Sequence, residues 1–92
     1  MAVTVKVPTI LRQHTDGAAL IEGQGATLRE VLKDLDSRYP GISRSVVTDA
    51  GDLHPFVNVY LNDEDVRYLG ALETDVNDGD VVSILPAVAG GR

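Results

Sequence analysis

The first third of the chain alternates hydrophobic and polar residues in a way that predicts two strands joined by a turn. Residues 1–10 place valines at alternate positions between polar neighbours, the two-residue period of a strand with one buried face. Pro8 marks the end of this strand, because proline has no amide hydrogen to donate. The turn-forming sequence at 14–17 contains Asp-Gly, so we expect an antiparallel second strand over residues 18–22.

Residues 27–39 have the spacing of an amphipathic helix. Their apolar residues fall three and four positions apart, which puts them on one side of a helix with about 3.6 residues per turn. Thr27 and Glu30 fit a capping box at its start, and Pro40-Gly41 ends it. The other side is charged, so we expect this helix to cover one face of a sheet.

The second half of the chain predicts shorter elements separated by Asn-, Asp- and Gly-rich turns. In chain order these are a turn of helix within 42–47, strands over 56–61 and 66–69, a turn of helix over 71–76 and a last strand over 81–85. A hairpin, one helix and further strands in so short a chain indicate a small α+β fold, in which one sheet wraps a single helix. We expect a folded domain over residues 1–86 and a flexible C-terminal tail over 87–92, since the tail has no pattern that would bury it.

Composition narrows the possible functions. Ninety-two residues form one domain, and a formal net charge of −6 argues against nucleic-acid binding, which needs Lys and Arg against the phosphates. The absence of cysteine excludes disulfides, thiol nucleophiles and Cys-ligated metals. No apolar run approaches the ~20 residues of a membrane helix, so we expect a cytoplasmic protein with no membrane partner.

Two histidines and two acidic clusters are the candidate metal ligands, and we interpret all of them structurally. His14 lies in a turn and His54 stands beside a proline at a strand entry, and neither has a second histidine at helical spacing. The clusters at 63–65 and 78–80 lack the twelve-residue loop of a calcium-binding hand. Carboxylates and glycine are common in turns for local reasons, so we expect no bound metal.

Two serines are candidate reactive groups. Ser37 follows an aspartate, as does the phosphopantetheine serine of acidic carrier proteins, but that serine begins a helix and Ser37 ends one. Ser83 lies in the middle of a strand without an accompanying base. The sequence therefore predicts no catalytic residues, and we expect a protein that is not an enzyme.

The C-terminal residues form the remaining candidate site. Gly90 and Gly91 are adjacent, and composition alone leaves a frayed end and an extendable tail equally possible. From Pro86 onward such a tail would reach about 20 Å when extended. A tail of this kind would be thin enough to enter a partner's active site.

Three segments resemble the ubiquitin-like sulfur carriers of the MoaD/ThiS family. They are Val-Pro-Thr-Ile-Leu-Arg with the following His-Thr at 7–15, the stretch from Leu53 to Arg67, and Asp-Gly-Asp-Val-Val-Ser-Ile-Leu-Pro-Ala-Val-Ala-Gly-Gly at 78–91. These matches span the chain, and they are strongest with the actinobacterial members that carry sulfur for cysteine biosynthesis. The resemblance implies a β-grasp fold with a mixed sheet around one main helix.

The resemblance also implies a function and its partners. In the family, an E1-like adenylating enzyme uses ATP and Mg to activate the terminal glycine, which sulfur then converts to a thiocarboxylate. Gly91 would be that glycine, and the carrier itself would bind no cofactor. The sulfur would pass to a synthase, with a PLP-dependent cysteine synthase as the first expectation. A thioacid natural product, molybdopterin, thiamin, or a ubiquitin-like modifier role remain alternatives, as does an inert interaction domain.

The same resemblance assigns roles to the other tail residues. Those inserted into partner enzymes would be Pro86, Ala87, Val88, Ala89 and Gly90. Arg92 departs from the family pattern, because Gly91 has no free carboxylate while another residue follows it. The hypothesis is that a metal-dependent hydrolase removes Arg92 before activation, or acts later to release product. An arginine that is foreign to the natural chain is the alternative.

Overall fold

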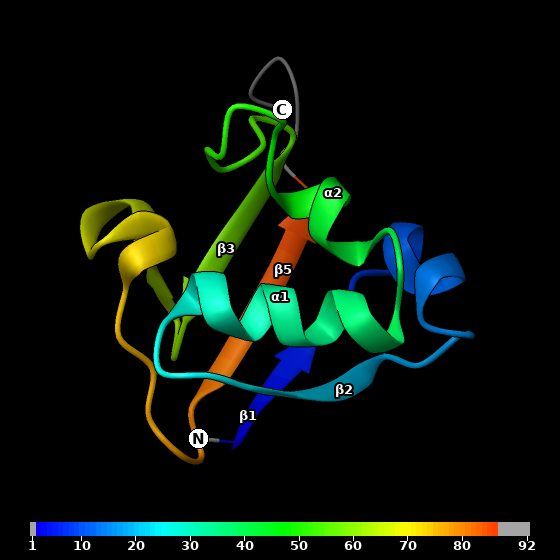
Figure 1. The fold of residues 1–92 in the computed structure, drawn as a ribbon, viewed down its shortest axis with the longest axis horizontal. Coiled ribbons are helices and arrows are strands. Elements are labelled where there is room, and N and C mark those ends of the chain that lie inside the picture. Colours follow the sequence, from blue (N-terminus) through cyan, green and yellow to red (C-terminus); the bar gives the residue numbers. More distant parts are fainter. Residues whose placement is uncertain (1, 87–92) are drawn as a thin grey trace.

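The computed structural model describes residues 2–86, which form a five-stranded mixed sheet (Figure 1). The strands lie in the order β2-β1-β5-β3-β4. Their bounds are β1 Ala2–Lys6, β2 Leu20–Gln24, β3 Val57–Leu61, β4 Glu64–Asp65 and β5 Val81–Pro86. The central strand β5 is parallel to its neighbour β1, and every other neighbouring pair is antiparallel.

Helix α1 (Leu28–Arg38) crosses one face of this sheet (Figure 1). Its four apolar residues are at most 2% exposed and pack against alternate residues of the strands, such as Val5 and Ile84. Burying this apolar side removes it from water and is the main reason that a sequence with this spacing folds as a covering helix. The expected β-grasp arrangement, with a mixed sheet wrapping one main helix, is confirmed.

The start of α1 is capped as the sequence predicts, with one difference. The hydroxyl of Thr27 accepts a hydrogen bond from the amide of Glu30 at 3.3 Å. The carboxylate of Glu30 reaches back to the amide of Ala26 at 2.8 Å, one residue beyond the position expected in a capping box. The Thr27 hydroxyl therefore satisfies an amide that the helix itself leaves unpaired, and the Glu30 carboxylate fixes the chain just before the helix.

Short helical segments complete the fold. Helix α2 (Ile42–Val46) confirms the turn of helix expected within 42–47. The other three are 3₁₀ helices: η1 Thr9–His14, η2 Val66–Tyr68 and η3 Ala71–Glu73. The helical turn expected over 71–76 is thus present in its first half.

The expected strand over residues 1–10 is too long. Thr9 and Ile10 belong to η1, where the amide of Leu11 bonds to the carbonyl of Pro8 at 2.9 Å. This turn carries Leu11 back into the core, where it is 7% exposed. Strand β2 correspondingly begins two residues later than expected, at Leu20.

The expected strand over 66–69 is wrong. Asn62 and Asp63 both have positive φ, 50° and 74°, which makes a tight two-residue turn and lets β4 start at Glu64. The carboxylate of Asp65 then accepts a hydrogen bond from the amide of Arg67 at 2.9 Å. That bond caps η2, so the chain turns helical where a longer returning strand was expected.

Candidate functional site at the end of strand β5

The predicted site lies at the carboxyl end of the central strand β5. Pro86, its last residue, is exposed and stands opposite Val57 of β3. The other residues assigned to the site, Ala87, Val88, Ala89, Gly90, Gly91 and Arg92, lie outside the described residues. The structure therefore defines the point from which the tail sequence continues.

Strand β5 is held on both sides, which fixes the position of its end. It pairs in parallel with β1 and antiparallel with β3, up to the Val57–Pro86 pair. Val82 and Ile84 point into the core and are each 1% exposed. The alternation of a strand then directs Ser83 and Leu85 to the face opposite α1.

The start of β3, beside Pro86, is held by a side chain from beyond the sheet edge. The guanidinium of Arg67 donates to the carbonyl of Val57 at 2.9 Å and to the side-chain oxygen of Asn58 at 2.8 Å. Asn58 stands opposite Leu85 of β5. Arg67 thus joins η2 to the part of β3 that faces the last two residues of β5.

The sheet face opposite α1 carries a row of side chains that runs across all five strands. The pairing register aligns Leu20, Lys6, Ser83, Tyr60 and Asp65, one from each strand. None of these residues is buried. We call this row, together with Leu85, the open face.

The open face is shallowly hollowed and partly apolar. Lys6 lines two depressions of about 360 and 240 Å³, and Leu85 lines both as well. The side chains of Leu20 and Leu85 are 60% and 46% exposed. Apolar side chains beside a single lysine form a surface suited to transient protein contact.

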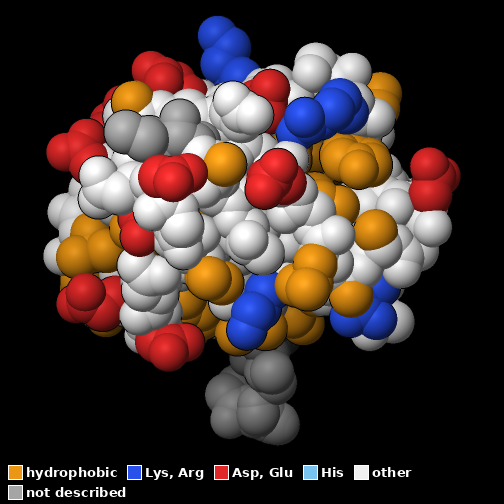
Figure 2. Space-filling model, turned by 90° about the horizontal axis from the view of Figure 1, so that it is seen from below, with side chains coloured by type: hydrophobic (Ala, Val, Ile, Leu, Met, Phe, Trp, Pro, Cys, Tyr) orange, Lys and Arg blue, Asp and Glu red, His pale blue; other side chains and the backbone are white. Residues whose placement is uncertain are grey.

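Figure 2 shows the charged side chains on one side of the molecule. On the side seen in Figure 2, acidic side chains are scattered, while hydrophobic side chains gather toward the lower margin with Lys and Arg side chains between them. Hydrophobic and cationic side chains thus lie side by side on this face, although the chain as a whole has a net charge of −6.

Both histidine rings have contacts within the fold. The ring of His14 packs against Gly41, and the Nδ1 of His54 accepts a hydrogen bond from the amide of Phe56 at 3.2 Å. Among residues 2–86 there is no group of three or more His, Cys, Asp or Glu that could hold a metal ion. The structural interpretation of both histidines agrees with these contacts.

The acidic clusters and Ser37 also have local structural partners. Asp78 accepts from the amide of Ala2, and Asp80 accepts from the amide of Asn77. The hydroxyl of Ser37 donates to the carbonyl of Asp34 within α1 at 2.7 Å. These bonds stabilise turns and a helix end, in agreement with a structural role for these residues.

Residues 2–86 contain no helix with the length and apolar character needed to cross a membrane.

Comparison with known proteins agrees with this geometry. The ThiS family model matches residues 5–91. The sulfur carrier protein CysO of Mycobacterium tuberculosis is 54% identical and covers 99% of this chain and 100% of its own. In the crystal structure of the Amycolatopsis orientalis BexX/CysO complex, the matched chain is 55% identical with a TM-score of 0.89, covering 97% of this chain and 99% of that one.

A further relative has a different named role. Small archaeal modifier protein 3 of Haloferax volcanii is 41% identical over 66 residues, which cover 72% of this chain and 71% of its own. ThiS-family proteins are small sulfur carriers rather than catalysts, in agreement with the expectation of a protein that is not an enzyme. With a family match that extends over nearly its whole length, this chain belongs to the ThiS family of ubiquitin-like sulfur carriers.

Proposed function

We propose that this chain carries sulfur as a thiocarboxylate on Gly91. The observation that carries the proposal is the family match through residue 91, which includes the Gly90-Gly91 pair. The exposed end of β5 at Pro86 supports it, because the tail sequence continues from a rigid central strand beside an accessible surface. Glycine has no Cβ to hinder attack on its carboxyl carbon.

The chemistry would need three steps. Hydrolysis of the Gly91–Arg92 peptide bond by a metal-dependent hydrolase would release the arginine and free the Gly91 carboxylate. That carboxylate would attack the α-phosphorus of ATP, supplied with Mg by an E1-like enzyme, and pyrophosphate would leave. A sulfide equivalent would then attack the acyl carbon, and AMP would leave with the electrons of the broken carbon–oxygen bond. The adenylate makes a good leaving group from a carboxylate that is otherwise a poor electrophile.

Partner enzymes are proposed to dock on the open face. It lies beside the end of β5, and it combines exposed Leu20 and Leu85 with the cationic Lys6. Support for a protein partner comes from the related CysO, whose structure was determined in complex with BexX. Docking there would hold the carrier while the tail enters the partner's active site.

The proposed acceptor of the sulfur is a PLP-dependent cysteine synthase. The support is the similarity to CysO over nearly the full chain. Synthases for a thioacid natural product, molybdopterin or thiamin would use the same thiocarboxylate, so they are distinguished by presenting the loaded carrier to each enzyme separately. We expect the cysteine synthase to form its sulfur-containing product from the loaded carrier and the other synthases to form none.

The test of sulfur loading uses three versions of the chain. They end at Arg92, at Gly91 and at Ala89, and each is incubated with the activating enzyme, Mg-ATP and sulfide. Intact mass spectrometry should show the exchange of one oxygen for sulfur only in the version ending at Gly91. Loading of the chain that still retains Arg92 would contradict trimming, and no loading of any version would contradict sulfur carriage.

A second candidate function is that of a protein modifier. The similarity to small archaeal modifier protein 3 favours it, since a modifier needs the same activated glycine. In that case the Gly91 acyl group would pass to lysines of other proteins and form isopeptide bonds. Covalent adducts on target proteins, without release of sulfur to a small acceptor, would support the modifier and contradict the carrier.

A further inference from the structure

The sheet has two outer edges, and they differ in length. Strand β4 at one edge has two residues, whereas β2 at the other has five. Short edge strands offer little for another strand to pair with, but a full-length edge presents a row of backbone donors and acceptors. The long β2 edge therefore requires some form of protection.

The pairing pattern identifies which backbone groups of β2 face outward. The amide of Val7 bonds to the carbonyl of Ala19, so the carbonyl of Ala19 points inward toward β1. Because backbone groups alternate along an antiparallel strand, those of Leu20, Glu22 and Gln24 point away from β1. An added strand would have to bond to these outward groups.

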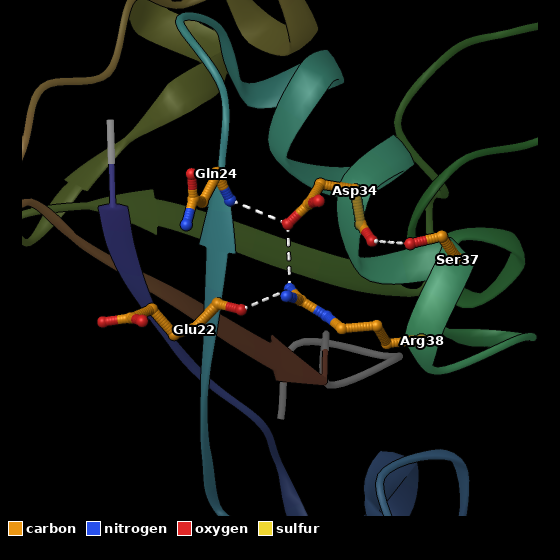
Figure 3. Close-up of polar contacts among 5 residues, drawn as sticks. All are labelled: Glu22, Gln24, Asp34, Ser37 and Arg38. Atoms are coloured by element: carbon orange, nitrogen blue, oxygen red, sulfur yellow. Dashed lines mark hydrogen bonds and ion pairs between the residues drawn. The ribbon is translucent and has the colours of Figure 1, made fainter.

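Two side chains of α1 occupy the centre of this edge (Figure 3). The carboxylate Oδ2 of Asp34 accepts a hydrogen bond from the amide of Gln24 at 2.9 Å. The Nη2 of Arg38 donates to the carbonyl of Glu22 at 2.6 Å and to the same oxygen of Asp34 at 2.8 Å. The side chain of Glu22 points away from Arg38, so the guanidinium meets the Glu22 backbone rather than its carboxylate.

We propose that Asp34 and Arg38 form an edge clamp that closes β2 against strand addition by a second copy of this chain. Asp34 supplies an acceptor to the Gln24 amide, and Arg38 supplies a donor to the Glu22 carbonyl. The backbone of an added strand would supply the same two groups. A second copy pairing antiparallel across the middle of β2 would need the carbonyl of Glu22 and the amide of Gln24, and both are already bonded. The clamp thus keeps a five-residue edge from acting as a template for self-association.

The ion pair alone would not explain this arrangement. Asp34 and Arg38 are four residues apart on a helix, and exposed pairs at that spacing contribute little to stability. Here each partner also bonds to the backbone of β2. The hydroxyl of Ser37 bonds to the backbone carbonyl of Asp34 and not to its carboxylate.

The experiment compares the double variant Asp34→Ala/Arg38→Ala with Arg29→Ala/Glu73→Ala. The control pair has a similar length, 2.7 Å, and joins α1 to η3 without bonding to the sheet edge. Sedimentation velocity from micromolar to millimolar concentration should show dimers of the clamp variant, while the wild type and the control remain monomeric. Hydrogen exchange on the dilute variant should show the Gln24 amide losing about tenfold or more of its protection, because a bond to a charged acceptor has been removed.

The proposal also requires that the dimers of the clamp variant associate through strand β2. In dimers of the clamp variant, the Glu22 amide should gain protection from exchange, since it would then pair with the second copy. A variant that stays monomeric at millimolar concentration, or that associates without protecting Glu22, would overturn the proposal. If the double variant does not fold, Asp34→Ala/Arg38→Met serves in its place, because methionine keeps the apolar stem of the arginine while both the Glu22 carbonyl and the Gln24 amide are reopened.

Discussion

At the scale of single residues, Gly41 is required for two independent reasons. Its φ is +101°, and a Cβ placed there would lie 2.8 Å from the Nδ1 of His14. Gly51 has a similar φ of +88° but open space where its Cβ would be. Gly51→Ala should lower the free energy of unfolding by about 1–2 kcal/mol from backbone strain. Gly41→Ala should cost about 1–3 kcal/mol more, from overlap with the ring.

Urea unfolding of both variants measures this difference, and His14→Ala provides the control. With the ring removed, Gly41→Ala should cost about as much as Gly51→Ala. Equal losses for the two glycine substitutions in the presence of His14 would show that the ring moves aside without cost. The contact between His14 and Gly41 joins η1 to the start of α2, and no local pattern in the sequence predicts it.

At the scale of elements, the N-terminal cap of α1 can be tested. Thr27→Ala removes the acceptor for the Glu30 amide and should lower the free energy of unfolding by about 1 kcal/mol. Glu30→Gln is the matched comparison, because a glutamine oxygen can still accept from the amide of Ala26. It should cost less than Thr27→Ala, since only the favourable charge at the helix start is lost.

Thermal or urea unfolding followed by circular dichroism gives both values. A Thr27→Ala variant as stable as the wild type would mean that water replaces the hydroxyl at no cost. A larger loss for Glu30→Gln than for Thr27→Ala would instead make the charge of Glu30 the dominant part of the cap.

The elements that could be predicted are those whose own sequence carries a strong signal. Helix α1 has a repeated apolar spacing, a cap and a stop, and it was predicted within one residue at each end. The strand expected over 66–69 failed because one side-chain bond, from Asp65 to the amide of Arg67, decided between strand and helix. The pattern of hydrophobic and polar residues does not show that a side chain will bond to a nearby backbone amide in place of a neighbouring strand.

The surface features could not be predicted, because they depend on how strands pair. Lys6, Ser83 and Tyr60 are far apart in the sequence, and only the register of three strands aligns them on the open face. Likewise, the charged residues of α1 suggest a solvated side, whereas Asp34 and Arg38 contact β2. The candidate tail was found from its sequence, and the surface beside it required the structure.

At the scale of the whole molecule, the two lysines of the chain test whether partners use the open face. Lys6 belongs to the open face, whereas Lys33 is exposed on α1, which covers the opposite face. Lys6→Glu and Lys33→Glu change the net charge equally, so any difference between them reports location. Lys6→Glu should weaken binding to the activating enzyme by tenfold or more, about 1.4 kcal/mol, while Lys33→Glu should have little effect. Surface plasmon resonance measures the dissociation constant of each variant with the activating enzyme. If the two variants bind equally weakly, the partner docks somewhere other than the open face.

Ionic strength separates local contact from long-range attraction in the same measurement. If the net charge of −6 steers the carrier toward cationic partner surfaces, raising salt should slow association, because the Debye length falls from about 10 Å at 0.1 M to about 3 Å at 1 M. The association rate should then fall with salt for the wild type and for Lys33→Glu alike, since both remain strongly acidic. The weakening caused by Lys6→Glu should persist at high salt if Lys6 makes a close contact in the complex. An association rate that does not change with salt would remove net charge from the explanation, leaving the shape and apolar residues of the open face to select the partner.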